Sequence, residues 1–113
     1  MHEASIALSL VELIEQTVAR EGASQALSAE VEIGALSHVE SEALAFAFAS
    51  ARLGGAAAAC RLEIRRPPGM ARCMACGQDT PLASRADPCP DCGSHQLLVT
   101  EGDQLRLKTV ELV

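Results

Sequence analysis

The 113-residue sequence contains no tryptophan, no tyrosine and only two phenylalanines, Phe46 and Phe48. Cations are also scarce, because nine Lys and Arg residues stand against fifteen Asp and Glu residues, for a formal net charge of −6. Nucleic-acid-binding proteins need cations for the phosphates and aromatic surfaces on which bases can stack. Both shortages therefore argue against a nucleic-acid partner.

Long apolar runs are missing as well. No stretch reaches the roughly 20 apolar residues of a membrane-spanning helix, and no charged segment followed by an apolar one opens the chain like a secretion signal. We therefore expect a cytoplasmic protein without membrane contact. There is also no Ser/His/Asp order, no phosphate-binding loop and no evident carboxylate pair, so we do not expect an enzyme.

Four of the five cysteines form two C-x-x-C pairs, Cys73 with Cys76 and Cys89 with Cys92, separated by twelve residues. In the cytoplasm such pairs indicate metal or redox chemistry rather than disulfides. Two intervening residues let the chain turn back so that both sulfurs of a pair face one ion. A glycine follows each pair and permits the positive φ of a tight turn. Four thiolates match a closed, tetrahedral and therefore structural Zn²⁺ site.

The fifth cysteine and two of the three histidines also have side chains that can bind metals. Cys60 lies on the inward side of an alternating segment, where a free cysteine behaves as a small hydrophobe. His38 is expected to be exposed in the first turn of a helix. His95 follows Cys92 by three residues and could cap the second pair, replace a sulfur ligand or help to bind a second ion. Solvent exposure is the simplest interpretation of His95.

The first part of the chain predicts a helix followed by a strand. Residues 4–21 have the apolar spacing of a helix, and Gly22 stands where a glycine commonly ends one. Residues 28–36 alternate between apolar and polar side chains, as in a half-buried strand. The predicted apolar stripe of the helix consists of Ala7, Val11, Ile14 and Val18, widened by Ile6, Leu10 and Leu13.

A second helix and a second strand follow. Residues 37–40 form a capping-box pattern that predicts a helix through about Leu53. Residues 60–65 alternate as another strand, so the order strand, helix, strand implies a right-handed crossover between parallel strands. The expected buried stripe of this helix is Leu44, Phe48 and Ala51, with Phe46 and Leu53 beside it.

The remaining sequence predicts an inserted domain. Pro67-Pro68-Gly69 ends the preceding strand, and the cysteine segment follows. Residues 97–100 and 105–112 are predicted strands, the last of which returns to the first sheet. We therefore expect an α/β fold with a small mixed sheet of about three strands and two helices. This α/β domain comprises residues 1–66 and 104–113, and a four-cysteine, zinc-ribbon-like domain comprises residues 67–103.

His2 allows a second metal site at the N-terminus. The α-amino group, the imidazole and the intervening backbone nitrogens can wrap one ion, and such nearly planar nitrogen donors suit Ni²⁺ or Cu²⁺ better than Zn²⁺. The amine and the imidazole must lose protons before they bind. Taken alone, His2 is explained more simply as a solvated polar residue.

Four features follow one another along the chain: Met1-His2-Glu3, Ile33-Gly34-Ala35-Leu36-Ser37, Phe46-Ala47-Phe48 and the paired C-x-x-C. In this order they resemble the HypA/HybF hydrogenase maturation proteins. The resemblance spans essentially the whole chain. It implies a nickel metallochaperone with a small α/β nickel domain and an inserted zinc domain. The implied nickel ligands are the Met1 amine, the His2 side chain and backbone, and the Glu3 backbone. The implied structural zinc ligands are Cys73, Cys76, Cys89 and Cys92.

The resemblance also implies partners: a HypB-type GTPase, the large subunit of [NiFe]-hydrogenase and, in some bacteria, urease accessory proteins. Two alternatives remain open from the residues. One is a zinc-ribbon module for protein interaction or transcription without a nickel function, and the other is a thiol oxidoreductase that uses the C-x-x-C pairs. An exposed strand edge is compatible with either a monomer or a homodimer.

Overall fold

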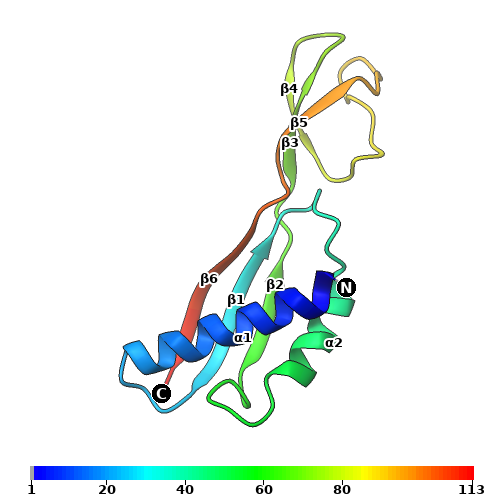
Figure 1. The fold of residues 1–113 in the computed structure, drawn as a ribbon. Helices are drawn as coiled ribbons and strands as arrows, with labels where there is room; N and C mark the ends of the chain where they lie inside the picture. Colours follow the sequence, from blue (N-terminus) through cyan, green and yellow to red (C-terminus); the bar gives the residue numbers. More distant parts are fainter. Residues whose placement is uncertain (1) are drawn as a thin grey trace. The chain divides into compact units, whose positions relative to one another are not determined.

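The structure is a computed structural model that describes residues 2–113, which form two helices and six strands (Figure 1). The strands form two three-stranded sheets, in the orders β2-β1-β6 and β4-β3-β5. In chain order the elements are α1 His2–Arg20, β1 Ala26–Ile33, α2 Ser41–Ala51, β2 Arg61–Arg65, β3 Gly69–Cys73, β4 Asp79–Leu82, β5 Leu97–Glu101 and β6 Leu105–Leu112. The predicted fold class, with two helices, a small mixed sheet and a four-cysteine cluster, is confirmed.

The chain divides into two compact units. Unit 1 comprises Met1–Val31, Val39–Ile64 and Arg106–Val113, and unit 2 comprises Glu32–His38 and Arg65–Leu105. Unit 1 contains both helices, and unit 2 contains β3, β4 and β5. Within residues 2–113, neither helix has the combination of length and apolar character that crossing a membrane requires.

Helix α1 confirms the predicted apolar stripe and its ending. Its buried residues are Ala7, Leu10, Val11, Ile14 and Val18. The N–H of Gly22 donates to the carbonyl of Ala19 (3.2 Å), and that of Ala23 donates to the carbonyl of Val18 (3.0 Å). With Gly22 at φ +68°, these bonds form a Schellman motif, which satisfies carbonyls that a helix end leaves free. Leu13, expected at the edge of the stripe, is 47 % exposed.

Strand β1 lies at the centre of the first sheet. Ala26, Ala29, Val31 and Ile33 are buried, which confirms the predicted alternation. Figure 1 shows β1 and β2 running in the same direction and β6 in the opposite one. The sheet is therefore mixed, as expected from a strand–helix–strand crossover followed by a returning last strand.

Helix α2 begins at Ser41, so the predicted capping box at residues 37–40 is wrong. Its N-cap is Glu40, whose side chain accepts a hydrogen bond from the N–H of Glu42 (3.2 Å). Residues 34–37 instead form turns held by tertiary bonds in unit 2. The N–H of Leu36 donates to the carbonyl of Gly102 (2.9 Å), and Leu36 is 2 % exposed. These contacts outweigh the local preference of Ser37 for a helix start.

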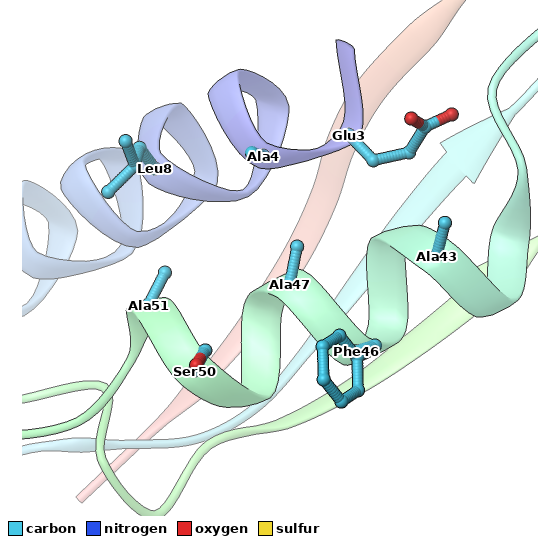
Figure 2. A pocket seen from close by; sticks show the side chains of 8 residues that line it. All are labelled: Glu3, Ala4, Leu8, Ala43, Phe46, Ala47, Ser50 and Ala51. Atoms are coloured by element: carbon cyan, nitrogen blue, oxygen red, sulfur yellow. The ribbon is translucent and has the colours of Figure 1, made fainter. Parts of the chain in front are cut away.

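The apolar face of α2 is narrower than expected. Leu44 and Phe48 are buried, and Ala51 is half-buried. Phe46 is 80 % exposed and Leu53 is 71 % exposed, so the expectation that both lie beside the core is wrong. Helix α2 ends at Ala51, which leaves Leu53 in the following turn. The side chain of Phe46 lies on the outer surface of the helix (Figure 2).

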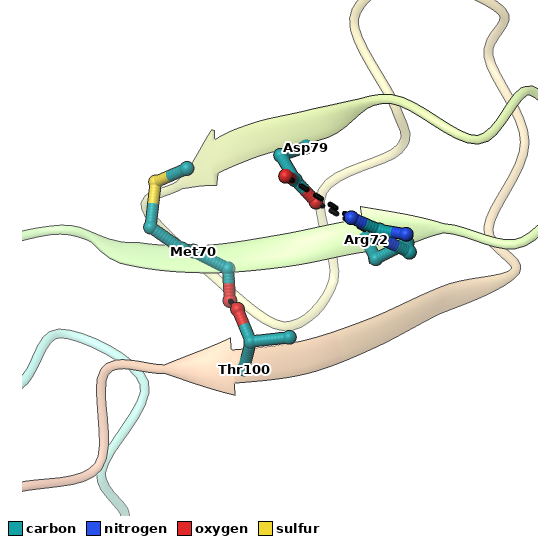
Figure 3. A network of polar contacts seen from close by, with 4 residues as sticks. All are labelled: Met70, Arg72, Asp79 and Thr100. Atoms are coloured by element: carbon teal, nitrogen blue, oxygen red, sulfur yellow. Dashed lines mark hydrogen bonds and ion pairs between the residues drawn. The ribbon is translucent and has the colours of Figure 1, made fainter.

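Unit 2 is built on an antiparallel sheet in which β3 lies between β4 and β5. The guanidinium of Arg72 binds both carboxylate oxygens of Asp79 across β3 and β4, at 3.0 and 3.3 Å (Figure 3). On the other side, the Thr100 hydroxyl donates to the carbonyl of Met70 (3.2 Å). Strands β3 and β4 were absent from the sequence prediction, since both are short and β4 contains Pro81.

Candidate metal centres

The four paired cysteines come together in unit 2. Their Sγ atoms all lie within 4.8 Å of one another. The Sγ atoms of Cys73 and Cys92 are 3.6 Å apart, and those of Cys76 and Cys89 are 3.8 Å apart. Four sulfurs placed ~2.3 Å from one Zn²⁺ in a tetrahedron would be ~3.8 Å apart. The donor set and its spacing therefore fit a four-coordinate zinc ion.

Both C-x-x-C segments adopt the same local structure, a knuckle. In each, the backbone carbonyl of the first cysteine accepts a hydrogen bond from the N–H of the glycine four residues later. The backbone N–H of the same cysteine donates to the carbonyl five residues later. These glycines, Gly77 and Gly93, have φ values of +78° and +76°, as the sequence predicted. The bonds are Gly77 N to Cys73 O (2.8 Å), Cys73 N to Gln78 O (2.9 Å), Gly93 N to Cys89 O (2.8 Å) and Cys89 N to Ser94 O (2.8 Å).

The sheet of unit 2 positions the first knuckle. Cys73 is the last residue of β3, which pairs on both sides. The N–H of Met74 donates to the carbonyl of Gln96 (2.7 Å), and this bond ties the first knuckle to the chain that leaves the second. Within the cluster Cys73 and Cys89 are buried, whereas Cys76 and Cys92 are exposed. A bound ion would thus be open to solvent on one side only.

The thiols of the cluster ionise unequally. The backbone N–H of Cys76 lies 3.5 Å from Sγ of Cys73, and it lowers the pKa of Cys73 to about 7. The backbone N–H of Gln78 favours the Cys76 thiolate, but desolvation and the neighbouring sulfurs outweigh it and raise the pKa of Cys76 to about 12. Neighbouring negative charges oppose each other, so a cation is needed to stabilise all four thiolates.

The predicted nickel ligands lie at the start of α1. His2 is the first helical residue described and is exposed, Glu3 is half-buried, and Met1 lies outside the described residues. The first four N–H groups of a helix have no acceptor within it. The backbone nitrogens of His2 and Glu3 are therefore not committed to the helix. The terminal chelate remains a prediction.

The Glu3 carboxylate has a role that the sequence did not predict. It accepts a hydrogen bond of 3.1 Å from the backbone N–H of Glu40, the N-cap of α2. This bond lowers the pKa of Glu3, to which its own backbone N–H also contributes. The capping pattern indicated that α2 begins nearby, but no local signal connects it to a residue 37 positions earlier.

The other candidate ligands lie apart from the cysteine cluster. Among residues 2–113, the quartet is the single group of three or more His, Cys, Asp or Glu residues placed to hold a metal. His95 is exposed, and so is His38, although His38 precedes α2 rather than lying in its first turn. Cys60 is fully buried, as expected, and burial raises the pKa of its thiol.

Comparison with known proteins relates the whole chain to one family. Residues 1–112 match the family model described as "HypA: Hydrogenase/urease nickel incorporation, metallochaperone, hypA". The chain is 47 % identical over 112 residues to a hydrogenase maturation factor HypA of Rhodopseudomonas palustris strain BisB5, with 99 % of each chain covered. It is 40 % identical to hydrogenase maturation factor HypA 1 of Bradyrhizobium diazoefficiens, with the same coverage.

Solved structures share the fold. The solution structure of the Ni metallochaperone HypA from Helicobacter pylori superposes with a TM-score of 0.68 at 23 % identity, over 98 % of this chain and 97 % of that one. A second solution structure, of a HypA protein, gives a TM-score of 0.71 at 25 % identity, over 100 % and 97 % of the two chains. The fold of this chain is thus shared with two structures solved in solution.

Proposed function

The chain belongs to the HypA family of hydrogenase and urease nickel-incorporation metallochaperones, and on this premise we propose that it binds Ni²⁺ at its N-terminus and delivers it for [NiFe]-hydrogenase maturation. The proposed nickel ligands are the amine of Met1, the side chain and backbone nitrogen of His2, and the backbone nitrogen of Glu3. The observation that carries the proposal is the exposed position of His2 in the first turn of α1. Backbone nitrogens in that turn are free to coordinate an ion that accepts planar nitrogen donors.

We further propose that Cys73, Cys76, Cys89 and Cys92 hold a structural Zn²⁺. The sulfur spacing matches a tetrahedral ion, and four protein ligands leave no position for a substrate. Zinc supplies folding free energy when bound. We assign zinc binding to the domain of residues 67–103 and nickel binding to the domain of residues 1–66 and 104–113.

The nickel ion is cargo, so the site must release it as well as bind it. A chelate made by consecutive exposed residues can lose its donors one at a time, as an acceptor replaces them. This is transfer between ligand sets and requires no catalytic residue. The proposed partners are a HypB-type GTPase, the hydrogenase large subunit and, where present, urease accessory proteins. None of the five cysteines, all within the described residues, forms a disulfide, as suits a protein of the cytoplasm.

Calorimetric nickel titration tests the proposal on four zinc-loaded proteins with defined N-termini. We expect the wild type to bind about one Ni²⁺ per chain, and His2→Ala to lose this binding. A third protein, with one residue added before Met1, should lose it as well because the amine is moved. His95→Ala is the matched control and should bind like the wild type. If His2→Ala or the extension keeps the affinity, the terminal chelate is wrong and a zinc module without a nickel function becomes the better explanation.

A further inference from the structure

An open apolar groove lies between α1 and α2 in unit 1 (Figure 2). Its volume is about 500 Å³. Helix α1 contributes Ala4 and Leu8, and helix α2 contributes Ala43, Phe46 and Ala47. Ala43 and Ala47 point toward α1 in Figure 2, whereas Phe46 stands on the outer side of α2. Small residues between two larger ones leave room for a third helix to approach closely.

The two large side chains of the groove are exposed without a role in the core. Phe46 is 80 % exposed and Leu8 is 56 % exposed. Phe48, two residues further on in the same helix, is 2 % exposed, so α2 uses one phenylalanine for the core and presents the other. Single exposed apolar residues are ordinary, but two large ones that line the same hollow indicate a binding surface.

The charged residue that lines the groove and two charged residues near its large apolar side chains are acidic. Glu12 lies four residues after Leu8 and Glu42 four residues before Phe46, and each is exposed. Residues four apart share a helix face, so these carboxylates border the two apolar side chains. Glu3 lines the groove itself, and none of its lining residues is Lys or Arg. An occupant with cations beside its apolar side would complement this rim.

We propose that this groove binds an amphipathic helix of another protein, with an apolar stripe flanked by Lys and Arg. Such helices dock through residues spaced three or four apart, which matches a groove between two helices with apolar walls. A second copy of this chain is a poor occupant, because the chain carries a net charge of −6. Glu3 lies at the groove and next to His2. The further identification of the occupant as a protein that exchanges nickel with this chain rests on the proposed function.

The test uses two synthetic helical peptides, each of about 18 residues, long enough to form a helix in isolation. Both carry the same leucine stripe, flanked by Lys in one and by Glu in the other. Fluorescence anisotropy titration with the full, zinc-loaded chain should show binding of the Lys peptide only. We expect Leu8→Ala and Phe46→Ala each to weaken it about tenfold, as losses of anchor residues do.

Leu13→Ala is the matched control, because Leu13 is also exposed on α1, at 47 %, but does not line the groove. It should leave peptide binding unchanged. Glu42→Lys adds a variant that retains every apolar residue and should weaken binding of the Lys peptide. Equal effects of Leu8→Ala and Leu13→Ala, or equal binding of the two peptides, would overturn the proposal.

Two further measurements separate this proposal from its alternatives. Sedimentation of the chain alone would identify a second copy as the occupant if Phe46→Ala dissociated a dimer, and this result would overturn the proposal. Nickel titration of Leu8→Ala and Phe46→Ala should match the wild type, because neither residue is a proposed nickel ligand. If nickel binding survives His2→Ala while Leu8→Ala still loses the peptide, the groove stands and the proposed function fails.

Discussion

The Glu3 carboxylate accepts a hydrogen bond from the backbone N–H of Glu40, with 3.1 Å between oxygen and nitrogen. The bond joins the first turn of α1 to the N-cap of α2. The Glu40 side chain in turn accepts from the N–H of Glu42. Backbone donors at the start of α2 are thereby satisfied by two carboxylates, which also suit the positive end of the helix. The residue next to His2 is thus tied through its side chain to the start of α2.

Glu3→Gln is expected to lower the thermal midpoint slightly near pH 7, because a neutral amide oxygen is a weaker acceptor than a carboxylate. The folded pKa of Glu3 lies below its ordinary value of 4.5. Its contribution to stability is therefore fully present above about pH 4.5 and is lost as the pH falls through the folded pKa. The difference in midpoint between wild type and variant should shrink below that pH. Glu12→Gln serves as the control, and an equal shift there would contradict the role of the Glu40 contact.

Zinc removal should unfold unit 2 and spare unit 1. The apolar cluster of unit 2 contains three buried residues, Leu36, Ala71 and Leu82, too few to offset the cost of ordering the chain. Unit 1 retains its own core, including Ile14 and Leu44. After treatment with a chelator, amide exchange should rise sharply in β3 to β5 and little in α1.

Cys73→Ser should likewise raise amide exchange in β3 to β5. It should also reduce the amount of bound zinc, measured by metal analysis, because one of four ligands is lost. Cys60→Ala is the matched control, since Cys60 is a buried cysteine outside the cluster, and it should retain about one zinc per chain. Zinc should also dissociate on acidification as the thiolates take up protons. Cysteines that react freely with a thiol reagent while zinc stays bound would instead favour the oxidoreductase alternative.

Features with a local cause could be predicted from the sequence. The stripe of α1 follows from helical spacing, and the positive φ of Gly77 and Gly93 follows from the turn after each C-x-x-C pair. The quartet itself was found because its spacing is a property of the chain. In each case the residues that determine the structure are close in sequence.

Features set by distant residues could not be predicted. Ser37 has a capping-box sequence, yet Leu36 is fixed by Gly102 in unit 2, and this contact moves the start of α2 to Ser41. The Glu3–Glu40 bond likewise depends on how α1 packs against α2. Helical spacing predicted that Phe48 is buried, but it did not show that Phe46, expected beside the core, is 80 % exposed.

Gly34→Ala should destabilise the protein by about 1–3 kcal/mol, the usual cost of forcing extra atoms into a packed site. A Cβ at Gly34 would overlap the backbone oxygen of Gly102, and backbone cannot move aside as a side chain can. Urea unfolding of zinc-loaded protein measures the change. Gly55→Ala is the control, because its Cβ would meet only the flexible end of the Glu15 side chain. Equal stability of the two variants would show that the backbone at Gly102 leaves room for a Cβ at residue 34.

Leu36→Ala tests whether the connection between β1 and α2 is part of unit 2. Leu36 is 2 % exposed and packs with Ala71 and Leu82, and its carbonyl accepts a hydrogen bond of 2.9 Å from Nε of Arg85.

Leu36→Ala should lower the free energy of unfolding by about 2–5 kcal/mol, the range for a buried leucine cut to alanine. Leu98→Ala is the control, because Leu98 is 58 % exposed, and it should cost less than about 0.5 kcal/mol. Because Leu36 is bound in unit 2, Leu36→Ala should raise amide exchange in β3 and β4 more than in α1. Faster exchange in α1 than in β3 would instead mean that Leu36 supports unit 1.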